Sequence, residues 1–229
     1  MAVTRMLASV LMAFVLALSA PSRASEPVPT RAIFVIVENG ITVTGKTAET
    51  NLQITKSVLG QIRGMKIRDG AETTTLHVIL TSDPGRILWS GTPRDLKRQA
   101  AALVQRIEFV PTCSDLARTY ELVDVTRRIE RPDETLIFAI GPGLNLGYPC
   151  GEGDLEITLP QPMPRGFKLP EIALEASKVA LLNLHHSQLP VMLGLFSRTG
   201  VMERAQTDAL SLHILDEART RAAINTILE

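Results

Sequence analysis

Residues 40–47 of the chain form a string whose residue types could bind a nucleotide. The segment reads GITVTGKT and fits the phosphate-binding pattern G-x-x-x-x-G-K-[ST] letter for letter. In such a loop, Gly40 and Gly45 would let backbone N–H groups surround the phosphates. Lys46 would reach the terminal phosphate and Thr47 would hold Mg²⁺. The string therefore makes a P-loop nucleotide-binding protein one alternative for the function of the chain.

Other features of the sequence count against a P-loop. Ile41 and Val43 are β-branched, and such residues suit an extended chain better than a tight nest of N–H groups. No apolar strand ends directly in an aspartate that could bind the metal, since Asp83 follows the run LHVILT only after Ser82. A threonine-rich loop with a solvated lysine is the simpler interpretation.

The first 24 residues have the layout of a secretory signal peptide. A single arginine precedes an apolar run from Met6 to Ala20, and Ser22-Arg23-Ala24 places small residues at a cleavage site. We expect a signal peptide over 1–24, a flexible leader over 25–30 and one folded domain over 31–229. The protein would then be exported, to the periplasm or beyond the cell, where nucleotides are scarce. An uncleaved N-terminal anchor is the alternative.

Composition limits the classes of partner. The formal net charge is +0 and the pI is about 6.9, so no overall basic field attracts nucleic acid or anionic lipid. No apolar run after residue 24 is long enough to span a membrane. We therefore expect an exported protein as partner, with no nucleic acid and no membrane insertion after cleavage.

The two cysteines, Cys113 and Cys150, are expected to form a disulfide, because an even count in an exported chain favours pairing. The bond would join residues 37 positions apart (150 − 113), a closure worth about 3–4 kcal/mol in the chain-entropy model. Two buried free thiols are the alternative.

Apolar runs and helical periodicity alternate along the chain. Strands are expected at 32–37, 76–81, 86–90, 135–140, 189–196 and 210–215, and helices at 49–63, 94–107, 115–130, 171–184 and 216–228. Ser114 is the expected N-cap of the third helix. The pattern predicts an α/β fold of three layers: a doubly wound, mostly parallel central sheet of about six strands with helices on both faces.

In such sheets, ligands meet the loops at the carboxyl ends of the strands, here 38–47, 111–115 and 141–150. Residues 141–170 are rich in glycine and proline and predict a long loop, with a strand-like piece at 155–159. His185 and His186 are interpreted as charges near the C-terminus of the helix 171–184. No nucleophile elbow, H-E-x-x-H or C-x-x-C motif is present, so no enzyme is expected.

The order of these segments resembles a von Willebrand factor A-type domain over residues 31–229. LHVILTSDPGRILWS resembles the second and third strands of that family, and CSDLARTYELVDVTRRI resembles the segment whose Thr-Asp-Leu opens a helix. ALEASKVALLNLHHSQLPVMLGLF is similar to the helix and strand after the fourth strand, and LHILDEARTRAAINTIL to the closing strand and helix.

The resemblance implies a metal-ion-dependent adhesion site that is degenerate in this chain. The family's Asp-x-Ser-x-Ser can be aligned in two ways. In the first it falls on Val37 to Ile41, so that Val37 replaces the Asp and Ile41 the last Ser. In the second it falls on Glu38 to Thr42, so that Glu38 replaces the Asp, Gly40 the first Ser and Thr42 the last Ser. Ser114 stands at the family's Thr position, and Ile140-Gly141-Pro142 offers no carboxylate after the fourth strand. Hard divalent ions need several oxygen ligands, so we expect no cofactor.

The resemblance also implies a function. We expect a non-catalytic protein-binding module that acts through the loops at the carboxyl ends of the strands, without a metal ion. A metal-dependent adhesion domain that holds Mg²⁺ or another divalent cation is a further alternative, beside the P-loop. The residues expected on the binding face are Glu38, Asn39, Thr42, Ser114 and Asp115.

Overall fold

A computed structural model describes residues 29–66, 70–146, 155–156 and 166–228 of the chain. The expected signal peptide and most of the expected leader lie outside these residues. A six-stranded sheet in the order β3-β2-β1-β4-β7-β8 forms the centre of the domain. Only β3 is antiparallel to its neighbour. The predicted mostly parallel, doubly wound sheet is confirmed.

The strands are continuous apolar runs because the sheet is covered on both faces. All but the first residue of β1 are buried, and alternate side chains of each strand point into opposite layers. The six strands of the sheet are β1 (Arg31–Val37), β2 (Thr74–Leu80), β3 (Ile87–Gly91), β4 (Glu134–Ile140), β7 (Lys178–Leu184) and β8 (Ser211–Asp216). A separate two-residue pair joins β5 (Asn145–Leu146) to β6 (Leu155–Glu156).

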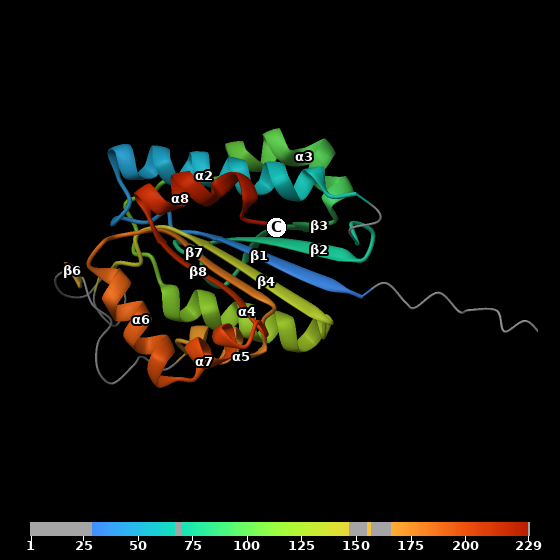
Figure 1. Cartoon of the computed structure of the whole chain (residues 1–229). Helices are drawn as coiled ribbons and strands as arrows, with labels where there is room; N and C mark the ends of the chain where they lie inside the picture. Colours follow the sequence, from blue (N-terminus) through green and yellow to red (C-terminus); the bar gives the residue numbers. More distant parts are fainter. Residues whose placement is uncertain (1–28, 67–69, 147–154, 157–165, 229) are drawn as a thin grey trace, which may run out of the picture.

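Helices cover the two faces in separate sets, visible above and below the sheet in Figure 1. One layer holds α2 (Gly45–Gly64), α3 (Pro93–Gln105), α8 (Glu217–Ala223) and the short 3₁₀ helix Ile224–Thr226. The other holds α4 (Leu116–Glu130), α5 (Leu169–Glu175), α6 (Gln188–Arg198) and α7 (Val201–Gln206). Each layer encloses its own hydrophobic cluster against the sheet, as the predicted three-layer architecture requires.

Two of the predicted elements are wrong in type. Residues 171–184 form the end of α5 and then strand β7 instead of one helix, and residues 189–196 lie in helix α6 instead of a strand. The run 189–196 and the centre of β7 are almost entirely apolar, and periodicity does not separate a strand buried on both faces from a buried helix. His185 and His186 consequently follow a strand and precede a helix, so their interpretation as helix C-terminal charges is also wrong.

The start of α4 differs by one residue from the prediction. Asp115, not Ser114, is the N-cap, and its Oδ1 accepts a hydrogen bond from the backbone N–H of Arg118 (2.9 Å). The hydroxyl of Ser114 instead has partners on other loops, described below. The predicted strand-like piece 155–159 is described only at Leu155–Glu156, in β6.

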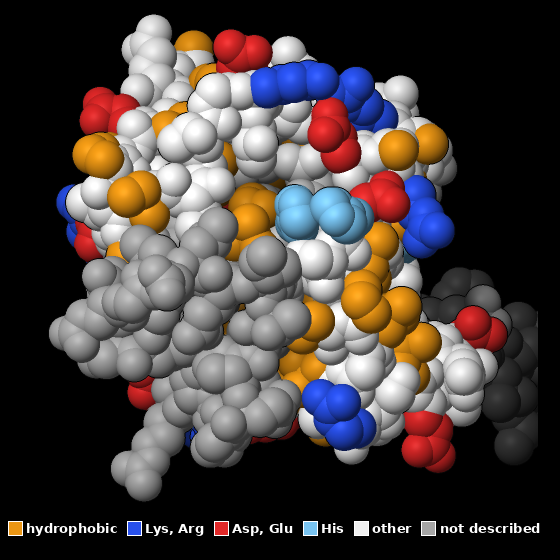
Figure 2. All heavy atoms as spheres, turned by 90° about the vertical axis from the view of Figure 1, so that its left-hand side faces the viewer, with side chains coloured by type: hydrophobic (Ala, Val, Ile, Leu, Met, Phe, Trp, Pro, Cys, Tyr) orange, Lys and Arg blue, Asp and Glu red, His pale blue; other side chains and the backbone are white. Residues whose placement is uncertain are grey.

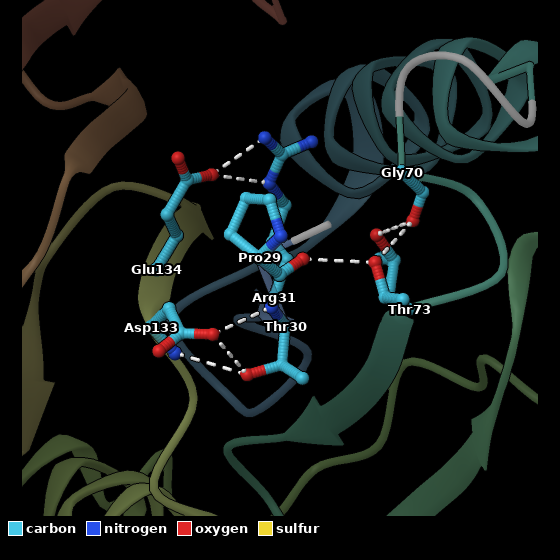
Figure 3. Close-up of polar contacts among 8 residues, drawn as sticks. Pro29, Thr30, Arg31, Gly70, Thr73, Asp133 and Glu134 are labelled. Atoms are coloured by element: carbon cyan, nitrogen blue, oxygen red, sulfur yellow. Dashed lines mark hydrogen bonds and ion pairs between the residues drawn. The ribbon is translucent and has the colours of Figure 1, made fainter. Parts of the chain in front are cut away.

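The chain enters the sheet at the amino ends of the strands, where Figure 3 shows Pro29 to Arg31 held from both sides. The backbone N–H of Thr30 donates to Asp133 (2.7 Å), and the hydroxyl of Thr73 donates to the Pro29 carbonyl (2.8 Å). The guanidinium of Arg31 pairs with Glu134 on β4. The loops at the carboxyl ends of the strands lie at the opposite edge of the sheet from these contacts (Figure 1). No helix among the described residues is long and apolar enough to cross a membrane.

Candidate functional site

The carboxyl ends of the parallel strands form one side of the molecule, which we call the loop face. It comprises residues 38–44 after β1, 81–86 after β2, 106–115 before α4, 141–144 after β4 and 185–187 after β7. Figure 2 views this side and shows histidine side chains next to hydrophobic and acidic ones. A cleft of about 410 Å³ opens here between Thr42, Leu144, His186 and Glu217.

Glu38 joins the first loop to the loop after β4. Its side chain is buried, and its Oε1 accepts the backbone N–H of Gly143 at 2.9 Å. Burial raises the pKa of Glu38 from its ordinary 4.5 to about 8, although the backbone N–H groups of Gly143 and Leu144 lower it. At neutral pH the carboxyl group is therefore mostly protonated, and it ties two loops together as a neutral group.

Asn39 connects the first loop to two further segments. Its Nδ2 donates to the Ser82 hydroxyl and to the Glu108 carbonyl, each at 2.7 Å, and its Oδ1 accepts the Ser82 backbone N–H at 3.0 Å. The backbone of Asn39 also accepts a hydrogen bond from the N–H of Val110 (2.9 Å). The side chain is buried, so its amide positions the loops and is not itself exposed to a partner.

Ser114 holds the second connection between loops. Its hydroxyl accepts from the backbone N–H of Gly40 (3.1 Å) and from the hydroxyl of Thr81 (2.9 Å). A Cβ at Gly40 would lie 2.5 Å from both Ser114 Oγ and the Thr112 carbonyl, so only glycine allows this close approach. Ser114 and Asn39 are therefore structural members of the loop face.

The residues that would hold a divalent ion do not fit that role. The Glu38 carboxyl already accepts the Gly143 N–H, Asp115 caps α4, and the loop after β4 offers Gly141 where a carboxylate is needed. Within the described part of the chain, no group of three or more His, Cys, Asp or Glu side chains is placed to hold a metal ion. Hard cations require several charged oxygen ligands, and this donor set lacks them.

Several backbone N–H groups of the loop 40–47 are already hydrogen-bonded. The N–H of Gly40 donates to Ser114 and that of Ile41 to Thr112, both on the loop before α4. The N–H of Val43 donates to Gly40 and that of Thr47 to Thr44, within the loop itself. Lys46 is exposed at the start of α2. A phosphate-binding nest needs convergent free N–H groups, and these bonds occupy four of them.

Cys113 lies on the loop before α4, next to Ser114, and is not a free thiol. Cys150 lies outside the described residues, so its pairing with Cys113 stays a prediction.

A buried pair of amides beneath the loop face was missed at the level of sequence. Asn51 on α2 donates to the Glu38 carbonyl (3.1 Å), and Asn183 on β7 donates to Asn51 Oδ1 (2.7 Å). Asn183 has φ = 61° and interrupts the pairing of β7 with β8, and its backbone N–H donates to the Thr220 hydroxyl. Asparagine tolerates this left-handed conformation better than most residues. The sequence would have indicated a role for Asn183 only if residues 178–184 had been assigned to a strand.

The loop after β7 also escaped prediction. His185 Nδ1 lies 2.6 Å from the Ser187 hydroxyl, and the two histidine rings are 4.1 Å apart. Burial and the neighbouring His186 lower the pKa of His185. Gln188 follows at the start of α6 and is buried.

No protein-family pattern and no curated protein sequence matches the chain. Among solved structures, the PilB minor pilin from Streptococcus sanguinis is similar with a TM-score of 0.56 and 5% identity, over 90% of this chain and 61% of that chain. A mutant of the same pilin gives a TM-score of 0.53 and 8% identity, over 90% and 62%. The chain has the fold of this minor pilin. It spans about three fifths of the length of both pilin structures.

A less extensive similarity is found to the vWF domain of the type V pili tip protein Mfa5 from Porphyromonas gingivalis. The TM-score is 0.37 and the identity 10%, over 52% of this chain and 40% of that chain, and we draw no argument from it. The pilin comparison shows similarity of fold alone. It establishes nothing about a metal site.

Proposed function

We propose that the chain is an exported, non-catalytic module that binds another envelope or extracellular protein through its loop face, without a bound metal ion. The observation that carries the proposal is the set of side-chain hydrogen bonds between loops. These bonds join the loop after β1 to the loops after β2 and β4 and to the loop before α4. They are made by the side chains of Glu38, Asn39 and Ser114. A surface ordered before binding loses less conformational entropy when a partner docks.

The fold supports the same proposal. The structures of similar fold are of a minor pilin, and we extend from them the expectation of a cell-surface binding role. The loop face also presents a large apolar side chain to solvent, since Ile41 is 44% exposed. Exposed apolar side chains surrounded by polar groups are common anchors in protein interfaces.

Affinity capture from envelope extract tests the proposal. The tagged, processed protein should retain one stoichiometric partner, and the complex should survive EDTA. Ile41→Asp should abolish capture, because it puts a charge into the centre of the contact. The matched control is Ile129→Asp on α4, where the wild-type side chain is 75% exposed but lies off the loop face, and it should capture normally. Equal capture by both variants would place the binding surface elsewhere.

Two alternatives have their own tests. The P-loop alternative requires that the mature protein bind a labelled ATP analogue and that Lys46→Ala abolish this binding. The metal-dependent alternative requires that Mg²⁺, Mn²⁺ or Ca²⁺ raise the melting temperature of the mature protein. The hydrogen bonds that already occupy N–H groups of the loop 40–47 disfavour the first, and the shortage of carboxylates disfavours the second.

A further inference from the structure

The outer surface of α2 and α3 carries far more positive than negative charge, although the formal net charge of the chain is +0. The two helices contain only two carboxylates, Glu49 and Asp95, and Asp95 already caps α3 and pairs with Arg98. Five further cations on these helices are exposed and form no ion pair with a carboxylate among the described residues: Lys46, Lys56, Arg63, Arg94 and Lys97. The zero net charge therefore conceals one face with a positive potential, which attracts anionic groups.

A groove of about 470 Å³ lies on this surface between α2 and α3, which run side by side in Figure 1. Two of the exposed cations, Lys56 and Arg63, line it from α2. The rest of its lining is mostly small or aliphatic: Leu59 and Gly60 from α2, and Ala100, Ala101 and Val104 from α3. The groove thus combines an apolar floor with a positively charged rim.

A second hollow continues the groove along the seam between the two helices. It measures about 860 Å³, and its described lining holds Lys66, Arg94 and Lys97 against one carboxylate, Glu72. From the first hollow to the second, the lining residues rise in number along α2 and fall along α3. The helices are therefore antiparallel, the hollows follow one another, and cations line both.

Gly60 in the floor of the groove has no packing reason to be glycine. It lies inside α2, and glycine within a helix is less favourable than alanine or leucine. A Cβ at this position would meet no atom within 4 Å outside the helix's own backbone, so the free protein has room for a side chain there. A glycine in an open groove instead lets the backbone of another chain approach closely. This observation is independent of the charges and also points to a bound chain.

We propose that the groove between α2 and α3 binds an acidic segment of another protein. The carboxylates of the segment pair with Lys56 and Arg63, and its backbone packs over Gly60. Its apolar side chains contact the apolar floor, as in amphipathic segments that bind in a groove between helices. A flat lipid surface would contact the cations but not the floor. The groove shares no residue with the loop face, so this inference goes beyond the proposed function and does not depend on it.

Binding of labelled peptides to the mature protein tests the class of ligand. The probe is a fluorescein-labelled peptide of Glu-Ala-Leu-Glu repeats, and the comparison is the same peptide with lysine in place of glutamate. Fluorescence anisotropy should show binding of the acidic peptide alone, and the binding should weaken as NaCl is raised, because salt screens exposed charges. No binding of the acidic peptide at low salt, or equal binding of both peptides, would overturn the proposal. Tighter association with vesicles of phosphatidylglycerol and phosphatidylcholine than with the acidic peptide would also overturn it and assign the face to a lipid surface.

Three variants test whether the peptide binds in the groove. Lys56→Glu/Arg63→Glu should weaken binding about tenfold, because two exposed ion pairs are lost. The control Arg118→Glu/Arg198→Glu makes the same change of charge at exposed positions on α4 and α6, in the other helical layer, and should bind as the wild type does. Gly60→Leu should fill the groove and weaken binding, yet raise the urea midpoint of the free protein, because leucine forms helix better than glycine. Equal weakening by the two double variants would show a response to overall charge alone. That result, or unchanged binding or a lower urea midpoint in Gly60→Leu, would overturn the proposal.

Discussion

Replacement of Glu38 by glutamine should make the protein more stable, by an amount that grows with pH. The Glu38 carboxyl is buried and accepts the Gly143 N–H. Glutamine has nearly the same shape and keeps an oxygen for that bond, but it cannot ionise. The variant therefore copies the protonated form of Glu38 at every pH.

The magnitude follows from the pKa difference between the folded and unfolded states. The pKa of Glu38 is about 8 in the folded protein against an ordinary value of 4.5. Between these values the unfolded chain has lost the proton that the folded chain keeps, so the free energy of unfolding falls as pH rises. At about 1.36 kcal/mol for each pKa unit, the loss is on the order of 4–5 kcal/mol. It is absent below pH 4.5 and complete above pH 8.

Urea unfolding at whole pH values from 5 to 9 measures this difference. Trp89, the single tryptophan, is buried and reports unfolding by fluorescence. The gap between Glu38→Gln and the wild type should be about 1 kcal/mol or less at pH 5 and several kcal/mol at pH 9. Glu49→Gln, at an exposed position on α2, should leave the pH dependence unchanged. Parallel stability curves for Glu38→Gln and the wild type would refute a protonated, buried Glu38.

Three further outcomes are expected. Gly143→Ala should lower the free energy of unfolding by about 1–3 kcal/mol, measured with urea, because φ is +70° there and a Cβ would crowd β7; an unchanged midpoint would contradict this geometry. Asn51→Leu should cost about 2–4 kcal/mol and increase hydrogen exchange on β7, because it leaves Asn183 and a carbonyl unpaired; unchanged exchange on β7 would argue against this network. Peptide mapping of the unreduced protein should find Cys113 linked to Cys150, and reduction should cost about 3–4 kcal/mol; two free thiols would disprove the pairing.

Most of the architecture could be predicted from the sequence because the strands β1, β2 and β4 are short apolar runs that end at turn residues. Such runs, alternating with amphipathic helices, leave few arrangements besides a covered parallel sheet. The prediction failed where helix and strand share the same composition. LPVMLGLF became α6 and KVALLNL became β7, and in both runs the apolar residues follow one another without a period that separates the two structures.

The candidate site was predicted only in outline. The first loop, with Glu38, Asn39 and Thr42, was placed correctly at the carboxyl end of β1, because the position of a loop follows from the order of the elements. The roles of these residues were not predictable. Whether a carboxyl group is ionised depends on what surrounds it, and for Glu38 the surroundings come from Gly143, about a hundred residues later.

The sequence by itself determined the class of fold and which loops lie at the carboxyl ends of the parallel strands. Both follow from local patterns, since each strand and each turn is specified by neighbouring residues. The tertiary structure alone decided which apolar run enters the sheet, and so placed the two histidines at the loop face. It also decided that Glu38 is buried as a neutral group. Burial and hydrogen bonding depend on contacts between distant segments, and these exist only once the chain has folded.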